Sequence, residues 1–483
     1  MLAFFIIMGI VLSVFLPLFF LRHKITKNTF EKLVKIFSIV IIVLVTLRGF
    51  LNDNFIWVVN GGTYGEIYYD ARDYLQSFLR WGLMVTSVVY PCACFFTKKS
   101  MKNIAIYICF PIVLISLCNY KTFLDYFITS SGRAIYAPEM FRHIEFSLEL
   151  ILMMIIPLLL RFCLGNKFNI KSKKEWLYFI LLTVGSFFVA MPVTLPQSLF
   201  GYTKYKMNVF SSFHLMWVLS IFAVYIVLYM IFRFKDKETR FELCVFLSIF
   251  LFLHYNSIYL MDLNMKRLPF QLCNLGSYLI LISLILKKQP FYNFIFLANV
   301  PGALIAFCAP DINNGLLSYW NIHFYFEHMW VFIIPLLMVS LRIMERPNKT
   351  AWKHFFIGFS TYFVFCATAG IIANSFLYDK TSLFFNEVNY FYLFDDTVLT
   401  ALPSLIFLYD WAVTINGYTF YPLYMTAIYI LFSVFCYGFY YVYVRLCKVG
   451  DEHFNLRKIR IEKMEKWGRY KRRPSPPKDY YVD

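Results

Sequence analysis

Apolar segments of about 20 residues recur along the whole of this 483-residue chain. Each is about long enough to cross the hydrocarbon core of a bilayer as an α-helix. The apolar runs are continuous rather than alternating, which is typical of helical membrane proteins. We therefore predict an all-α, polytopic membrane protein with about thirteen spans, at residues 2–21, 33–51, 76–96, 103–118, 146–163, 176–195, 210–232, 241–261, 269–286, 290–308, 324–343, 353–374 and 419–444.

Composition excludes the main alternatives to a membrane protein. Hydrophobic residues make up 60% of the chain and charged residues only 15%, which excludes a soluble globular domain and a disordered chain. The net charge of +18 would suit a nucleic-acid partner, but the basic residues follow the predicted loops instead. The eleven cysteines contain no C-x-x-C pair, so neither a disulfide framework nor a zinc site is predicted.

The distribution of basic residues predicts the orientation. If the N-terminus lies outside, most of the 46 Lys and Arg residues fall in cytoplasmic loops and in the C-terminal tail. The opposite orientation would reverse this bias, so the positive-inside rule favours N-out, C-in. The first segment lacks the positive n-region of a signal peptide and is interpreted as a retained span. The predicted location is a cell membrane, namely a bacterial plasma membrane.

Two halves of the chain repeat the same order of segments. FSLELILMMIIPLLLRF at 146–162 aligns with FYFEHMWVFIIPLLMVSL at 324–341, which matches Glu149 to Glu327, and Trp176 matches Trp352 in the segments that follow. Six spans precede the second copy, so both copies run the same way. We predict a parallel duplication of six and seven helices. The predicted domains are a degenerate repeat at 1–205, a seven-helix domain at 206–445 and a basic cytoplasmic tail at 446–483.

The second copy carries reactive groups that the first lacks. Cys273 aligns with Arg80, His328 with Leu150 and His214 with Ala3. Cys273 follows Pro269 within the first turn of a span, where the helix dipole lowers the pKa of a thiol. A neighbouring histidine could take its proton, as in acyl transfer.

The other candidate residues reach the same predicted membrane boundary. Cys273 as nucleophile and His328 as base are the predicted catalytic residues. The predicted supporting residues are His214, Gln271, Asn274, Asp311, Glu327, Asn389 and Tyr390. Polar groups within a membrane are costly and are often functional. Each also has a simpler interpretation: Cys273 as a small packing residue, the Glu327–His328 pair as a polar contact between helices, and Asp311 as a turn residue.

Five short motifs carry a resemblance to a known family. They are FSSFH with His214, LPFQLCN with Cys273, VPGALIAFCAPD with Gly302 and Asp311, FYFEH with His328, and NYFYL with Asn389 and Tyr390. Over about 209–440 the chain resembles the YwaF-type integral membrane proteins, whose eukaryotic relatives include a transmembrane acyltransferase of ether phospholipids. The resemblance implies an acyl-lipid enzyme with Cys273 as nucleophile and His328 as base.

Three functions stay open from the sequence. The first is acyl transfer between membrane phospholipids through a Cys273 thioester, with no cofactor, no metal and no nucleic acid. The second is a lipid or small-molecule permease, in which the same polar residues line a path. The third is a non-catalytic membrane assembly or sensor protein. Polar residues of the second copy concentrate near one membrane surface, which favours the enzyme.

Cysteines introduced at Ser382 and Ser475 test the predicted orientation. In the N-out, C-in arrangement the 375–418 loop lies outside and the tail lies inside. A membrane-impermeant thiol reagent applied to intact cells should therefore add label to the Ser382→Cys protein and none to the Ser475→Cys protein, relative to the unsubstituted chain. Labelling of Ser475→Cys alone would show the reverse orientation.

Overall fold

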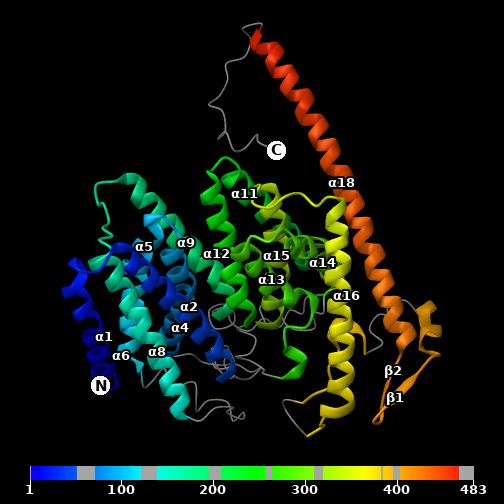
Figure 1. Ribbon diagram of the computed structural model, residues 1–483, viewed down its shortest axis with the longest axis horizontal. Coiled ribbons are helices and arrows are strands. Elements are labelled where there is room, and N and C mark those ends of the chain that lie inside the picture. The colour runs from blue at the N-terminus through cyan, green and yellow to red at the C-terminus, as the bar shows by residue number, and fades with distance from the viewer. Residues whose placement is uncertain are drawn as a thin grey trace. The chain divides into compact units, whose positions relative to one another are not determined.

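The computed structural model describes residues 2–51, 71–120, 139–194, 208–256, 264–308, 310, 319–381, 385–394 and 403–466. Nearly all of its elements are helices (Figure 1). The chain separates into two compact units. Unit 1 comprises Met1–His214, Val245–Leu263 and Ile312–Glu327, and unit 2 comprises Leu215–Cys244, Asn264–Asp311 and His328–Asp483.

Unit 1 contains the helices of the N-terminal half. These are α1 (Leu2–Phe20), α2 (Lys27–Leu51), α4 (Ala71–Phe95), α5 (Lys99–Ile104), α6 (Phe110–Cys118), α8 (Glu139–Leu158) and α9 (Lys173–Thr194). The π-helical turn η2 (Ala105–Cys109) joins α5 to α6, and a second one, η3 (Leu159–Cys163), extends α8. A 3-10 turn, η1 (Leu21–His23), follows α1.

Unit 2 contains most of the helices of the C-terminal half. These are α11 (Ser212–Phe232), α13 (Leu272–Leu286), α14 (Gln289–Cys308), α16 (Lys349–Ile372) and α18 (Pro422–Lys466). Three helices, α11, α12 (Lys237–Asn256) and α15 (Tyr319–Ser340), contribute residues to both units. Shorter turns are η5 (Met265–Arg267), η6 (Ala373–Leu377), η7 (Tyr390–Tyr392) and η8 (Pro403–Tyr409).

The predicted helical membrane protein is confirmed at this level. With Lys99–Cys118 counted as one helix, the described residues contain thirteen helices, and each overlaps one predicted span. Eight of the helical segments in the described ranges are long and apolar enough to cross a membrane: Leu2–His23, Lys99–Cys118, His143–Cys163, Ser212–Phe232, Gln289–Cys308, Asn321–Ser340, Lys349–Leu377 and Pro422–Glu452. The chain is therefore a multi-pass membrane protein, while its orientation and its duplication stay predictions.

The last helix is longer than predicted. The apolar pattern places its end at residue 444, but α18 runs for 45 residues to Lys466 (Figure 1). The residues after 444 are rich in Lys, Arg and Glu, which are strong helix formers, no Pro interrupts them, and the helix continues through Gly450. The last span and the first part of the basic tail thus form one continuous helix.

A short β-hairpin interrupts the otherwise helical structure. Strands β1 (Val413–Ile415) and β2 (Tyr418–Phe420) pair antiparallel, with Thr414 opposite Thr419. Asn416 and Gly417 form the two-residue turn, with φ of 49° and 82°. Asn-Gly favours this turn because both residues adopt positive φ at low cost. The chain is predicted to contain helices and loops only, and the end of the predicted loop at 375–418 instead forms part of a two-stranded hairpin.

Capping side chains explain where several helices begin. The Asn348 side chain accepts hydrogen bonds from the backbone N–H groups of Thr350 and Ala351 at the start of α16. The Asp236 carboxylate accepts from the N–H of Thr239 at the start of α12, at 2.8 Å. Such caps satisfy N–H groups that have no partner within the helix. At α13, by contrast, the N-cap residue Gln271 makes no capping hydrogen bond with its side chain.

Packing within unit 1 satisfies a carbonyl that a proline leaves open. Pro157 lies inside α8 and has no N–H, so it cannot bond the carbonyl of Met153 four residues earlier. The hydroxyl of Tyr90, a buried residue of α4, donates to that carbonyl at 2.6 Å. A further bond between helices joins the Trp81 indole N–H to the carbonyl of Phe187 in α9, at 3.0 Å.

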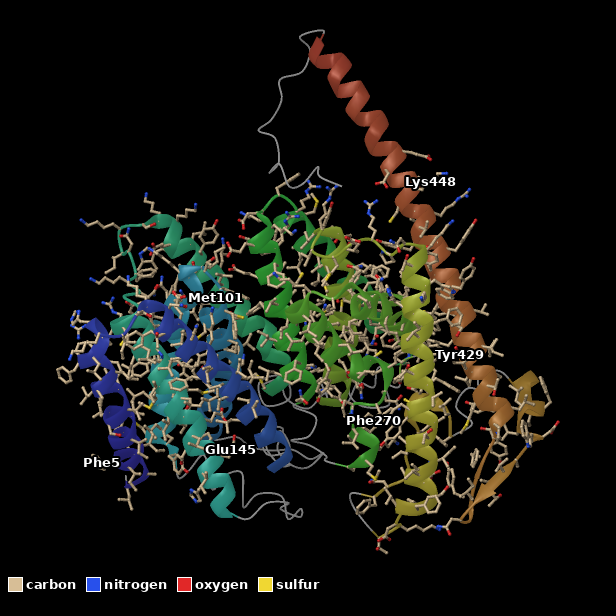
Figure 2. All side chains as sticks on the ribbon, in the orientation of Figure 1. Phe5, Met101, Glu145, Phe270, Tyr429 and Lys448 are labelled. Carbon is tan, nitrogen blue, oxygen red and sulfur yellow. The ribbon has the colours of Figure 1, made fainter. Side chains whose placement is uncertain are left out.

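Packing within unit 2 depends on close contacts at glycines. A β-carbon at Gly276 of α13 would overlap the side-chain amide of Asn299 in α14 and would lie 3.5 Å from Cγ1 of Val331 in α15. The Asn299 amide donates to the carbonyl of Leu272 at 2.6 Å. Small residues at such positions let membrane helices approach closely. Side chains fill the spaces between the helices of each unit (Figure 2).

Replacement of Gly276 tests this packing. Gly276→Ala should displace the Asn299 amide and weaken its bond to Leu272, at a cost of about 1–3 kcal/mol of stability. Thermal unfolding in detergent should show a lower midpoint. Gly185→Ala is the matched control, because Gly185 also lies in a helix and a β-carbon added there would have no atom within 4 Å. Equal midpoints for the two variants would contradict the close contact.

Candidate functional site

Five of the predicted site residues lie at or near the N-terminal end of α13: Gln271, Cys273, Asn274, Asn389 and Tyr390. Gln271 is extended, with φ of −72° and ψ of 148°, and α13 begins at Leu272. Cys273 is therefore the second residue of the helix, within the first turn as predicted, although α13 begins three residues after the predicted start at Pro269. Its side chain is partly exposed, as is that of Asn274. Phe270, just before the helix, is labelled in Figure 2.

Gln271 links the start of α13 to the loop at 389–391 by hydrogen bonds. Its side-chain amide N–H donates to the carbonyl of Asn389 at 2.7 Å, and its amide oxygen accepts from the N–H of Phe391 at 2.9 Å. One side chain thus satisfies a donor and an acceptor of the loop backbone. Three predicted site residues, Gln271, Asn389 and Tyr390, are brought together in this way. The contacts that they make hold the loop in place.

The loop itself is strained. Phe391 and Tyr392 have φ of 55° and 57°, a left-handed conformation that costs non-glycine residues about 1–3 kcal/mol each. The Phe391 ring lies 5.5 Å from that of Phe359 and 5.2 Å from that of Phe432, measured between centroids. The Tyr424 hydroxyl donates to the carbonyl of Tyr392 at 3.0 Å. Such strain persists only where surrounding contacts maintain it, and it is concentrated at functional sites.

Two polar side chains of the loop anchor it further. The Tyr390 hydroxyl donates to the carbonyl of Met265 at 2.7 Å, and the Asn389 side-chain oxygen accepts from the N–H of Phe394 at 2.9 Å. Burial raises the pKa of Tyr390, and the proximity of Cys366 raises it further. The hydroxyl therefore keeps its proton at neutral pH and remains a donor.

Helix α16 closes another side of the same region. The Tyr362 hydroxyl and the Cys366 thiol both donate to the carbonyl of Phe270, at 2.8 and 3.4 Å. This carbonyl precedes the helix and has no helical partner, so the two side chains satisfy it. Cys273 lies within electrostatic range of Tyr362. Cys273 therefore lies close to the polar groups at the Phe270 carbonyl, to which Cys366 donates a hydrogen bond.

The helices that carry Cys273 and His328 run in the same direction. Helix α14 is antiparallel to α13, because Gly302 near its end lies against Leu272 at the start of α13. It is also antiparallel to α15, because the hydroxyl of Tyr292 near its start donates to the carbonyl of Pro335 in the second half of α15, at 3.1 Å. Gly276 and Val331 are neighbours, and Cys273 and His328 each lie three residues before them. His328 is partly exposed.

A second polar cluster is buried in unit 1. The imidazoles of His254 in α12 and His323 in α15 stack with centroids 4.6 Å apart, and Nε2 of His254 donates to the carbonyl of His323 at 3.3 Å. Nδ1 of His323 lies 3.7 Å from the Glu327 carboxylate. All three side chains are almost completely buried. The predicted residue Glu327 therefore contacts His323.

Neither His254 nor His323 is among the predicted site residues. An ionisable residue inside a predicted span is itself a functional signal, and His254 lies within the predicted span at 241–261. His214 occupies a different position: it is buried, its Nδ1 accepts from the N–H of Phe210 at 2.9 Å, and its ring lies 6.4 Å from that of Tyr325. In this contact His214 stabilises the start of its own helix.

Two candidate site residues remain, Asp311 and Asn274. Asp311 lies outside the described residues, as do Ser382 and Ser475. The backbone carbonyl of Asn274 accepts from the Ser277 hydroxyl at 2.7 Å. Within the described ranges, no group of three or more His, Cys, Asp or Glu side chains is placed to hold a metal ion.

Comparison with known families gives a match over the C-terminal half of the chain. The model of the TMEM164 family matches residues 209–440. The matched segment is a little under half of the chain and contains all the candidate site residues. No curated protein and no solved structure matches the chain.

The match agrees with the segment over which the sequence resembles a known family. The predicted limits, about 209–440, are the limits of the matched family model. The family found is TMEM164, which is linked to ether-lipid acyl transfer, as are the eukaryotic relatives of the predicted family. The name YwaF itself stays a prediction.

Replacement of Gln271 tests the anchoring of the loop. Gln271→Leu removes both hydrogen bonds to the 389–391 backbone and should allow the strained turn to relax. Amide hydrogen exchange in residues 388–394 should then rise by about tenfold or more, as expected when bonds worth about 1–2 kcal/mol are lost. Gln289→Leu is the control, because Gln289 bridges to Glu345 at a separate contact. Equal exchange in the two variants would show that Gln271 is dispensable.

Proposed function

We propose that residues 209–440 transfer acyl chains between membrane phospholipids, with Cys273 as the nucleophile and His328 as the base. The observation that carries the proposal is the placement of these residues on two parallel helices, each three positions before the contact between Gly276 and Val331. Residues three apart on a helix share one face. The two side chains are therefore at a common level. The match to the TMEM164 family supports the same chemistry.

The proposed reaction has two steps: acylation of Cys273 by a donor phospholipid and transfer of the acyl group to an acceptor lysolipid. His328 takes the proton of the Cys273 thiol, and the thiolate attacks the ester carbonyl of a donor phospholipid. The acyl–oxygen bond breaks, the leaving lysophospholipid oxygen takes the proton from His328, and a thioester remains. His328 then takes the proton of an acceptor lysolipid hydroxyl, which attacks the thioester. The new ester forms, and the proton returns from His328 to the released sulfur.

The start of α13 supplies the electrostatic part of the proposal. The partial positive charge at a helix N-terminus stabilises both a thiolate and the oxyanion of a tetrahedral intermediate. The Gln271 amide bonds to the 389–391 loop and not to the first N–H groups of α13. The positive end of this helix therefore has no capping hydrogen bond from Gln271. Asn274, on the same turn, is the proposed oxyanion donor. Gln271, Asn389 and Tyr390 have the proposed role of positioning the helix end and its adjoining loop.

Orientation and location complete the proposal. The excess of basic residues in alternate loops supports a plasma membrane in which the N-terminus of α13 faces the outer surface. The substrate site would then be reached from the outer leaflet. The N-terminal half, in which Arg80 aligns with Cys273, would contribute no catalytic residue.

The test is transfer of a labelled acyl chain by the full-length protein in detergent–lipid micelles. Cys273→Ser should reduce turnover by at least about a hundredfold, because a serine hydroxyl is a poor nucleophile without further activation. His328→Ala should cost a similar factor, and the double variant little more, since a nucleophile and its base act together. The wild-type protein should also form a thioester with the labelled chain.

Cys366→Ser is the matched control for Cys273→Ser. Cys366 lies near the same helix end, but its thiol contacts the carbonyl of Phe270, and a serine hydroxyl can keep that bond. Turnover should stay within about twofold of wild type. Full turnover in Cys273→Ser would refute the catalytic role. Lipid movement across vesicles without any acyl transfer would support the permease, and neither activity would support the assembly or sensor protein.

A further inference from the structure

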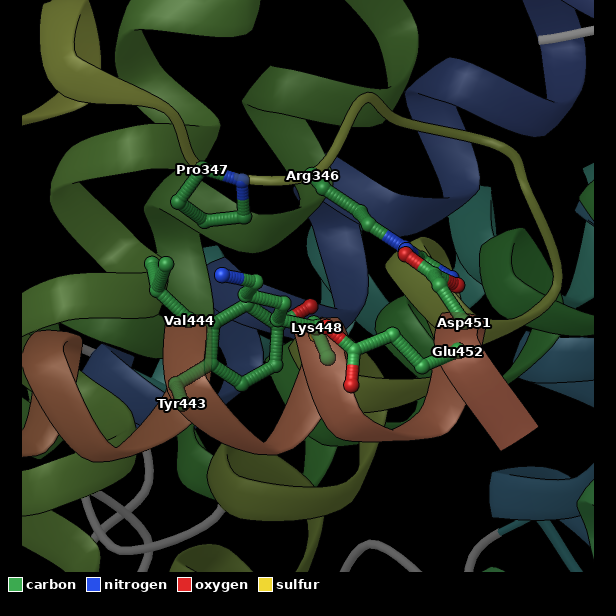
Figure 3. A pocket seen from close by; sticks show the side chains of 8 residues that line it. Arg346, Pro347, Tyr443, Val444, Lys448, Asp451 and Glu452 are labelled. Carbon is green, nitrogen blue, oxygen red and sulfur yellow. The ribbon is translucent and has the colours of Figure 1, made fainter. Parts of the chain in front are cut away.

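A cavity lies between α18 and the connection from α15 to α16 (Figure 3). Its volume is about 440 Å³, and its lining comprises Arg346, Pro347, Tyr443, Val444, Cys447, Lys448, Asp451 and Glu452. All of these residues belong to unit 2. The volume is within the range of small-ligand sites.

The charges around the cavity are balanced and separated. Arg346 and Lys448 are cationic, and Asp451 and Glu452 are anionic, so the formal charge of the lining is zero. Nη1 of Arg346 donates to the Asp451 carboxylate at 2.7 Å, which fixes the connection to α18. Both side chains of this pair remain about half exposed, and a guanidinium has further N–H donors for a second anion. A ligand that carries one positive and one negative group complements this lining better than a simple anion does.

The other walls of the cavity are apolar. Pro347, Val444 and Cys447 line it together with the ring of Tyr443. The predicted span at 419–444 ends at the cavity, so Lys448, Asp451 and Glu452 follow the apolar part of α18. Val442, Val444 and Leu446 are exposed on the same part of α18, where acyl chains could lie along the helix. Charged groups at the end of an apolar helix match the boundary between lipid headgroups and chains.

The cavity is far from Cys273. Tyr424 of α18 contacts the loop that Gln271 anchors, and Tyr443 of the cavity lies nineteen residues further along the same helix. Nineteen residues of α-helix span about 29 Å, close to the thickness of the hydrocarbon core. The cavity and the start of α13 are therefore separated along α18 by about one membrane thickness, which in the predicted topology places them at opposite membrane surfaces.

We propose that this cavity binds the zwitterionic headgroup of a phospholipid in the leaflet opposite to Cys273. Lys448 and the outer N–H groups of Arg346 hold the phosphate, while Glu452 and Asp451 face the cationic amine. The apolar walls receive the glycerol backbone and the first part of the chains. This inference is independent of acyl transfer and would hold in a protein without enzyme activity.

Retention of lipids measured by native mass spectrometry tests the proposal. The full-length protein is released from nanodiscs that contain equal parts of phosphatidylcholine and phosphatidylglycerol with the same chains. The wild-type protein should retain phosphatidylcholine in preference. Lys448→Gln should reduce that retention about tenfold, as expected for the loss of a charged hydrogen bond. Arg445→Gln is the control, because Arg445 is exposed on the same helix but does not line the cavity.

A charge reversal makes the test specific. Glu452→Lys changes the lining from neutral to a net charge of +2 and should shift the preference to the anionic phosphatidylglycerol. Cys273→Ser should retain phosphatidylcholine as the wild type does, which separates this site from the catalytic proposal. Preference of the wild-type protein for phosphatidylglycerol, or equal retention by Lys448→Gln and Arg445→Gln, would overturn the inference.

Discussion

The need of every backbone polar group for a partner inside a water-free membrane governs how this chain packs. Helices satisfy most of these groups, but prolines and helix ends leave carbonyls open. Tyrosine and amide side chains from neighbouring helices reach them: Tyr90 bonds the carbonyl left open by Pro157, and Tyr362 bonds that of Phe270 before α13. Because these bonds join one helix to another, the same contacts that remove an unsatisfied group also set the distance between helices.

The candidate site is a consequence of this pattern. The carbonyl of Phe270 and the backbone at 389–391 would be unsatisfied at the start of α13, and Tyr362, Cys366 and Gln271 bond them. The strained Phe391 lies against the rings of Phe359 and Tyr362, and the carbonyl of the strained Tyr392 accepts from the Tyr424 hydroxyl. These interactions fix the surroundings of Cys273 while its own side chain remains partly exposed. A rigid frame with an accessible thiol is a favourable arrangement for a nucleophile.

The helices could be predicted from the sequence because apolar length alone defines a span, and all thirteen predicted spans overlap helices. The hairpin at Asn416–Gly417 was missed although its turn dipeptide is a strong local signal. Gln271 and Asn389 are both predicted site residues, but a hydrogen bond between residues 118 positions apart cannot be read from composition. His254 was missed because its partner His323 lies on another helix, and only the fold brings the two rings together.

The predicted duplication distinguishes residues that both halves share from residues that only the C-terminal half contains. Glu149 of α8 aligns with Glu327 of α15, and both carboxyl groups are buried beside the repeated IIPLL run. The first copy has its own polar contacts, since the Tyr120 hydroxyl and Nδ1 of His143 lie 2.9 Å apart. A buried carboxyl group at the aligned position of both halves is what the predicted duplication requires of a shared helical frame. In the predicted alignment Cys273 and His328 correspond to Arg80 and Leu150, so the proposed reaction would belong to the C-terminal half.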